Sequence, residues 1–148
     1  MTFQEYLEKT KQIAQEEAEI LDQMSNKEKW SKIEIRAVKN SMQVIVENAI
    51  GKAKRILKHY NCPVIAQKGS DAFSFMYEIG LIDDDVYSTM KSAIGLRNAM
   101  IHDYMNFNDD ILMQVVHRKK YKLVISFLYS DISYTEVQLK RIENFFLT

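Results

Sequence analysis

One segment of the chain combines side chains that suit cleavage of a phosphodiester: Arg97-Asn98-Ala99-Met100-Ile101-His102-Asp103-Tyr104. An imidazole moves protons near neutral pH, and a guanidinium clamps a phosphate through two parallel hydrogen bonds. In a helix, Asn98 and His102 share one face because they lie four residues apart. Arg97 and Tyr104, seven apart, share another face if the helix continues that far. The segment is a candidate catalytic site, but from residue types alone a capped, partly exposed helix end without a catalytic role is the simpler interpretation.

Helices are expected to position this segment. Only four Gly and one Pro interrupt 148 residues, of which 47% are hydrophobic, and so few chain breakers favour long helices over an all-β fold. Apolar residues recur at spacings of three and four, and they follow the candidate capping residues Thr2, Ser70, Asp83 and Asn108. The pattern predicts an all-α fold with one domain over 1–148, an antiparallel bundle of four or five main helices.

The expected helix boundaries follow from these caps and from the breaks between them. The first helix should run over about 2–24, and the second over about 29–59, where Asn61-Cys62-Pro63 stops it. A short helix should end near Gly80, and the next should run from Asp83 to His102 or Tyr104. Another starts after Asn108, and a long final helix is expected from Tyr121 to Phe146.

The second predicted helix has an apolar stripe wider than one core face needs. Val44 and Val46 flank Ile45, and such a width would suit a helical dimer interface as well as a core. Glu47 lies in the same run, and a carboxylate buried there would need a partner. Arg97 is a candidate for that partner, and the other interpretation is that Glu47 faces water.

The charge balance limits the ways in which this chain could hold nucleic acid. Lys and Arg number 20, as do Asp and Glu, so the formal net charge is zero and a strong bulk field is excluded, although a local basic groove is not. Two basic sets occur, one of Lys52, Lys54, Arg55 and Lys58 and the other of His117-Arg118-Lys119-Lys120 with Lys122. A solvated surface is the simpler interpretation of both, and RNA phosphate or an acidic partner is the alternative for the second.

Neither metal, cofactor nor membrane is expected. Asp83-Asp84-Asp85 suits a helix start, and no HExxH or paired Cys/His spacing is present. Cys62 is the only cysteine and fits a reducing cytosol. The first residues lack the basic and apolar regions of a signal peptide, and the uncharged apolar runs are too short to cross a bilayer. We therefore expect a cytoplasmic location.

The motif and its surroundings resemble the HEPN superfamily. Arg97-Asn98-Ala99-Met100-Ile101-His102 fits its signature of an Arg, a polar residue, three variable positions and a His. The extension through Tyr104 is similar to the R-x-x-x-x-H-x-Y form of HepT toxins, the toxin halves of HEPN/MNT toxin–antitoxin pairs. The segment from Phe73 to Ile82 and the pair Gly95-Leu96 also resemble the family's sequence around this motif.

The resemblance implies a metal-independent endoribonuclease. Two protomers of a homodimer, or of a higher homo-oligomer, would bring their motif helices together. His102 would assist attack of a 2′-hydroxyl on the adjacent phosphate, Arg97 would stabilise the transition state, and Asn98 would hold the site in shape. The substrate would be RNA, such as mRNA or tRNA, and the products would carry 2′,3′-cyclic phosphate and 5′-hydroxyl ends.

The resemblance also implies regulation by a partner. A cognate MNT-type nucleotidyltransferase antitoxin would transfer AMP from ATP to Tyr104 and silence the toxin. The bland alternative is that Tyr104 only packs against the following loop. A second function stays open for the whole chain, because some HEPN domains bind nucleotides or serve as non-catalytic scaffolds of a nucleotidyltransferase complex.

Overall fold

Seven helices form in residues 1–64 and 66–145, which are the residues that the computed structural model describes. They are α1 (Phe3–Ser25), α2 (Lys32–His59), α3 (Asp71–Glu78), α4 (Asp84–His102), α5 (Asp109–His117), α6 (Lys122–Tyr129) and α7 (Glu136–Glu143). No strand forms in these residues, so the predicted all-α fold is confirmed. None of the described helices is both long enough and apolar enough to cross a membrane.

Local side-chain chemistry sets most helix starts. Thr2 and Ser31 each form a capping box with the glutamate three residues later, and the Asp83 carboxylate accepts from the amide of Val86. Helix α2 therefore begins at Lys32, three residues later than predicted. Ser70 precedes α3 as predicted, but its side chain makes no capping hydrogen bond.

Gly80 ends α3 in a left-handed backbone conformation. Gly80 has a φ of 77° and donates to the carbonyl of Tyr77, and the next amide, of Leu81, reaches back to the carbonyl of Met76. This double closure is a Schellman motif, which needs a left-handed residue where glycine carries no steric penalty. The turn ends α3 and directs the chain into α4.

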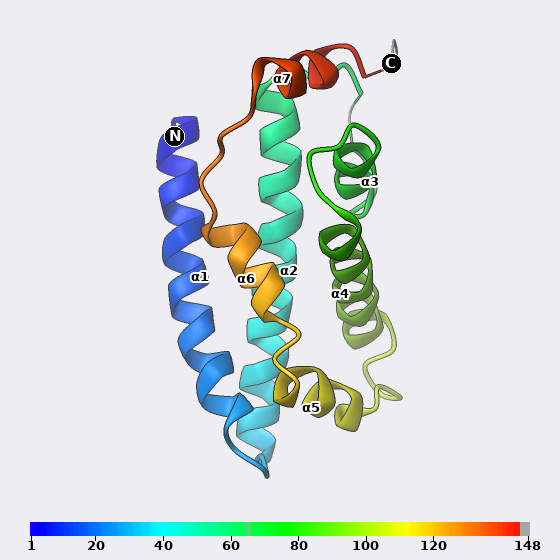
Figure 1. Cartoon of the computed structure of the whole chain (residues 1–148). Coiled ribbons are helices and arrows are strands. Elements are labelled where there is room, and N and C mark those ends of the chain that lie inside the picture. The colour runs from blue at the N-terminus through cyan, green and yellow to red at the C-terminus, as the bar shows by residue number, and fades with distance from the viewer. Residues whose placement is uncertain (65, 146–148) are drawn as a thin grey trace.

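The helices are arranged around α2. The long helices α1 and α2 lie side by side, and α6 packs against both (Figure 1). Helices α3 and α4 follow one another along another side of α2, while α5 lies near the end of the bundle where α1 turns into α2 (Figure 1). Val46 and Ile45 are both buried inside the chain, so the wide stripe of α2 is covered by neighbouring helices and does not require a dimer.

The long final helix is the one clear error in the predicted element order. Helix α6 ends at Tyr129, and α7 begins only at Glu136 after a Thr135 capping box. Residues 130–135 between them form no helix, and the predicted end at Phe146 lies outside the described residues. The final region is thus two short helices that cross different parts of the bundle (Figure 1).

A buried lysine of α2 binds the carbonyl oxygens at the C-terminal end of α6. Lys52 of α2 is fully buried, and its Nζ donates to the carbonyl oxygens of Phe127 at 2.6 Å, Leu128 at 3.2 Å and Ser130 at 2.8 Å. These carbonyls belong to the last turn, where no intrahelical donor is available. Burial lowers the pKa of Lys52 to about 8, so the ammonium form with its three donors still dominates at pH 7.

We predict that Lys52→Met lowers the free energy of unfolding by about 1–3 kcal/mol. It removes the donor to the Ser130 carbonyl and one of two donors to the carbonyls of Phe127 and Leu128. Urea unfolding followed by circular dichroism measures the change. Lys58→Met is the matched control, since Lys58 is exposed on the same helix and its loss should cost less than about 0.5 kcal/mol. Equal midpoints for the two variants would contradict the role given to Lys52.

Candidate functional site

The motif occupies the last turn and a half of α4 and the turn that follows. His102 is the last helical residue, and Asp103 caps the end through its amide, which donates to the carbonyl of Ala99. Residues 103–106 form a turn closed by Asn106, whose amide donates to the carbonyl of Asp103. Tyr104 therefore lies off the helix, so the condition for sharing a helical face with Arg97, that the helix continues that far, is not met.

Arg97 carries hydrogen-bond donors that the chain leaves unused. Its side chain is partly buried, and a Cβ added to Gly69 would lie 3.9 Å from its Nη2, so the guanidinium packs beside the loop before α3. Its Nε is buried without a hydrogen-bond partner. A buried donor without an acceptor is costly, and an anion at this position would remove the cost.

Glu47 is not the acceptor that was proposed for Arg97. Its side chain is exposed, and its Oε1 accepts from Nε2 of Gln43 at 3.2 Å, one turn away on α2. Solvent and a neighbouring amide satisfy this carboxylate, so it has no need of the arginine. The interpretation in which Glu47 faces water is the one that the structure supports.

The other two polar motif residues face outward. Asn98 and His102 are exposed on the same side of α4, as their spacing predicts. At about 100° per residue, His102 points about 140° away from Arg97 around the helix axis. One chain therefore presents the imidazole and the guanidinium on different sides of the same helix and brings neither into contact with the other.

Tyr104 rests on a lysine that the sequence did not single out. Its side chain is 58% exposed, and Nζ of Lys39 lies 5.0 Å from its ring centroid and 5.4 Å from that of Phe107. The same ammonium pairs with Oδ1 of Asp109 at 2.9 Å. Lys39 thus joins both ends of the loop that carries Tyr104 to α2, through cation–π and ionic contacts.

Helix α4 also has an interior glycine that its own chain does not require. A Cβ built on Gly95 meets no atom within 4 Å, and Gly95 is exposed on the side of Asn98 and His102. Glycine inside a helix costs about 1 kcal/mol relative to alanine. Close to this face are exposed apolar side chains, among them Met105, which is 94% exposed. The face is therefore suited to close contact with another molecule.

The described residues contain no group of three or more His, Cys, Asp or Glu side chains able to hold a metal ion. Asp83 acts as the cap of α4, and Asp84 accepts a hydrogen bond from the hydroxyl of Tyr77. The acidic run thus ties α3 to α4 instead of forming a ligand set.

Solved structures with a similar fold include two toxin–antitoxin complexes. One is the crystal structure of a toxin–antitoxin with AMP-PNP, with a TM-score of 0.71 over 86% of this chain and 99% of that chain. The other is a tri-AMPylated Shewanella oneidensis HEPN toxin in complex with MNT antitoxin, with a TM-score of 0.72 over 88% of this chain and 100% of that chain. Both are 22% identical to this chain, so they show the shared fold.

Sequence comparison adds the family. The mRNA nuclease HepT of Shewanella oneidensis is 36% identical over 52 residues, which are 35% of this chain and 39% of that relative. The match thus spans well under half of the curated relative. A family model described as ribonuclease HepT-like matches residues 3–129, which include all of the motif and the helices α1–α6 that hold it. The chain belongs to the ribonuclease HepT-like family.

Proposed function

We propose that this chain is the toxin of a toxin–antitoxin pair, a metal-independent endoribonuclease whose catalytic residues are Arg97 and His102. The observation that carries the proposal is the Nε of Arg97, a buried cationic donor without a partner, about one and a half turns from an exposed imidazole on the same helix. A phosphate would satisfy that donor, and an imidazole supplies the acid–base chemistry that phosphodiester cleavage needs. Family membership and the similarity to an mRNA nuclease support the same reaction.

The proposed reaction is an internal transfer within RNA. His102 accepts the proton of a 2′-hydroxyl, and the 2′-oxygen attacks the neighbouring phosphorus. The new P–O2′ bond replaces the P–O5′ bond, and the departing 5′-oxygen takes up a proton. Arg97 stabilises the negative charge that develops on the phosphoryl oxygens, and Asn98 orients the groups. The products are a 2′,3′-cyclic phosphate and a 5′-hydroxyl.

A second copy of the chain would complete this site. Because His102 and Arg97 point to different sides of α4, a partner helix facing α4 would set its own arginine or histidine beside them. Gly95 lets another backbone approach, and exposed apolar side chains such as Met105 and Ile101 border the same region. We propose a homodimer with His102 near its two-fold axis.

We further propose Tyr104 as the AMP acceptor for an MNT-type nucleotidyltransferase. The tyrosine oxygen would attack the α-phosphorus of ATP, pyrophosphate would leave, and the phenolic proton would pass to the partner enzyme. The exposed hydroxyl is accessible, and Lys39 offers a cation beside the phosphodiester so formed. The new charge would compete with RNA for Arg97, and the adenosine would obstruct the site. The AMPylated relative in complex with its antitoxin supports this regulation.

We predict that His102→Ala and Arg97→Ala each slow RNA cleavage by about 10²–10⁴-fold, since each removes a group that acts in the transition state. Cleavage of total RNA with and without EDTA, followed by mass spectrometry of the product ends, measures the rate and the chemistry. His59→Gln is the control, because His59 stacks on Phe3 at the other end of the bundle. A His102→Ala protein that cleaves as fast as its parent would favour the scaffold function instead.

Two substitutions at Gly95 distinguish the stability of the monomer from the stability of the proposed dimer. Gly95→Ala should raise the free energy of unfolding of the monomer by about 0.5–1 kcal/mol, because the helix gains and no atom is in the way. Gly95→Phe should shift the dimer toward monomer and reduce cleavage in parallel. Light scattering coupled to gel filtration measures the assembly. A Gly95→Phe protein that stays dimeric would place the interface elsewhere.

Tyr104 is tested by modification. Co-expression with a cognate MNT-type nucleotidyltransferase should add the mass of one adenylyl group to the peptide that contains Tyr104, and Tyr104→Phe should abolish that change. Lys39→Met should slow the transfer several-fold, because the loop loses its tie to α2. Intact and peptide mass spectrometry provide the measurement. A neutralised complex whose Tyr104 stays unmodified would show that the partner inhibits by binding alone.

A further inference from the structure

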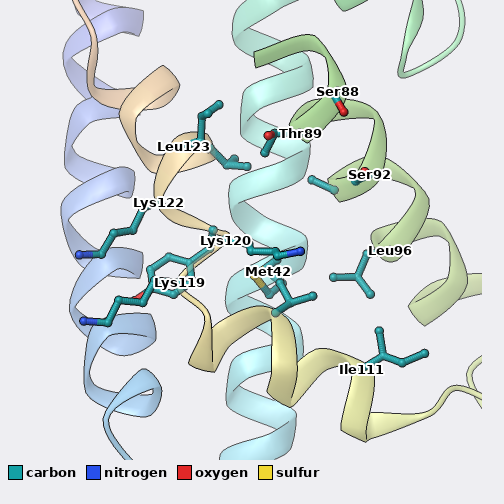
Figure 2. Close-up of a pocket in the computed structure, with 14 residues that line it drawn as sticks. Met42, Ser88, Thr89, Ser92, Leu96, Ile111, Lys119, Lys120, Lys122 and Leu123 are labelled. Carbon is teal, nitrogen blue, oxygen red and sulfur yellow. The ribbon is translucent and has the colours of Figure 1, made fainter. Parts of the chain in front are cut away.

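An open groove runs beside α4 on a side that the motif does not use. It lies between α4 and the segment from α5 to α6, with α2 beneath it, and has a volume of about 830 Å³ (Figure 2). Met42 of α2 forms its floor, and Leu96 of α4 and Ile111 of α5 line it as exposed or partly exposed aliphatic side chains. Ile111 is 48% exposed, so it offers apolar surface to a bound molecule.

Lys119, Lys120 and Lys122 all line this groove, but only Lys120 extends its ammonium group over it. Figure 2 shows the Lys120 side chain extending toward α4, whereas Lys119 and Lys122 extend to the other side, toward α1. The turn after α5 explains the divergence. Lys119 adopts a left-handed φ of 57°, and the amide of Lys120 donates to the carbonyl of Val115 at 3.0 Å. The closed turn therefore sets the direction in which the Lys120 side chain leaves the backbone.

The charge of Lys120 is unmatched. The described residues offer it no ion pair, and no acidic side chain lines the groove. The opposite wall carries the hydroxyls of Ser88 and Ser92 (Figure 2). An aliphatic channel with one cation and a row of hydroxyls is complementary to an amphipathic helix that bears a carboxylate. From Ser88 to Leu96 the wall is about 12 Å long, which accommodates about two turns of such a helix.

The groove leads to the acceptor tyrosine. Met42 on its floor is three residues, or about one turn, from Lys39, whose ammonium lies under the Tyr104 ring. Ile111 lies in the first turn of α5, which follows the loop that carries Tyr104. A protein seated in the groove would therefore have Tyr104 at one end of its footprint.

Two other occupants fit less well. The face proposed for the second copy carries Asn98, and Leu96 lies about 160° from Asn98 around α4, so a homodimer formed on that face leaves the groove open. RNA bases stack on aromatic rings, and the only ring in the groove belongs to Tyr121, which is 1% exposed and donates its hydroxyl to Asp22.

We propose that this groove is the docking site of the nucleotidyltransferase antitoxin, which inserts an amphipathic helix with aliphatic side chains against Leu96 and Ile111 and a carboxylate against Lys120. The inference rests on the proposed toxin function. It gives the partner a binding site on this chain. Docking at that site would bring the active site of the nucleotidyltransferase to Tyr104.

The test compares two lysines of equal charge that point in opposite directions. Lys120→Glu should weaken binding of a cognate MNT-type nucleotidyltransferase by about tenfold or more, and Ile111→Glu should do the same. Lys122→Glu is the matched control and should change the affinity by less than about twofold. Biolayer interferometry gives the affinities, and circular dichroism checks the fold. Cleavage of RNA without the partner should be the same in all three variants.

Each other outcome overturns the groove proposal. Lys120→Glu that binds the partner as tightly as Lys122→Glu rules out docking here. Loss of RNA cleavage in Lys120→Glu alone would make the groove an RNA site, and a shift to monomer would make it an interface between copies. A wild-type chain that cleaves no RNA and binds no nucleotidyltransferase overturns the proposed function as well, whereas failure of the groove alone appears only in the variants.

Discussion

Helix α2 must bury side chains around about half of its circumference, and the rest of the fold follows from that constraint. Ile45, Val46, Ala49 and Ile50 point in directions that span about 140° around the helix axis, and all four are buried. The helices α1, α3, α4 and α6 meet this requirement from different sides. One cation, Lys52, enters the same interior, where it is tolerated because α6 ends in carbonyl oxygens that bind it. With α4 held against α2, the polar face of the motif is turned outward.

Local chemistry made the first five helices predictable, and a long-range contact hid the break in the last. Caps such as Thr2 and Asp83 and the turn at Gly80 act within a few residues, so the sequence shows them directly. Residues 130–135 contain neither Gly nor Pro, and α6 stops where it does because Lys52 binds carbonyls 75 to 78 residues further along the chain. The capping box of Thr135 with Gln138 was the local signal that the apolar periodicity obscured.

Some residues of the candidate site could likewise be predicted from local sequence, whereas others depend on long-range contacts. Arg97 and His102 could be found because residue type and spacing on one helix carry the information. Arg97 and Tyr104 do not share a helical face because α4 ends at His102, and that end is set by the geometry of the Asp103 cap. Lys39 was missed because its contacts with Tyr104 and Asp109 come from a distant part of the chain. The zero net charge of the whole chain likewise conceals single cations that the fold places where they are unmatched.

The Lys52 contact also sets an order of events during translation. A nascent chain that has not emerged as far as Ser130 contains the whole motif but lacks the full set of carbonyls that accept hydrogen bonds from Lys52. The surface of α1 and α2 that α6 covers in the folded chain is then still exposed to solvent. Ribosomes add about 5–20 residues per second, so roughly 1–6 s separate synthesis of His102 from synthesis of Ser130. Closure of the bundle must follow that interval, because the segment that completes it is made after the motif. The candidate nuclease motif is therefore synthesised before the segment that completes the scaffold around it.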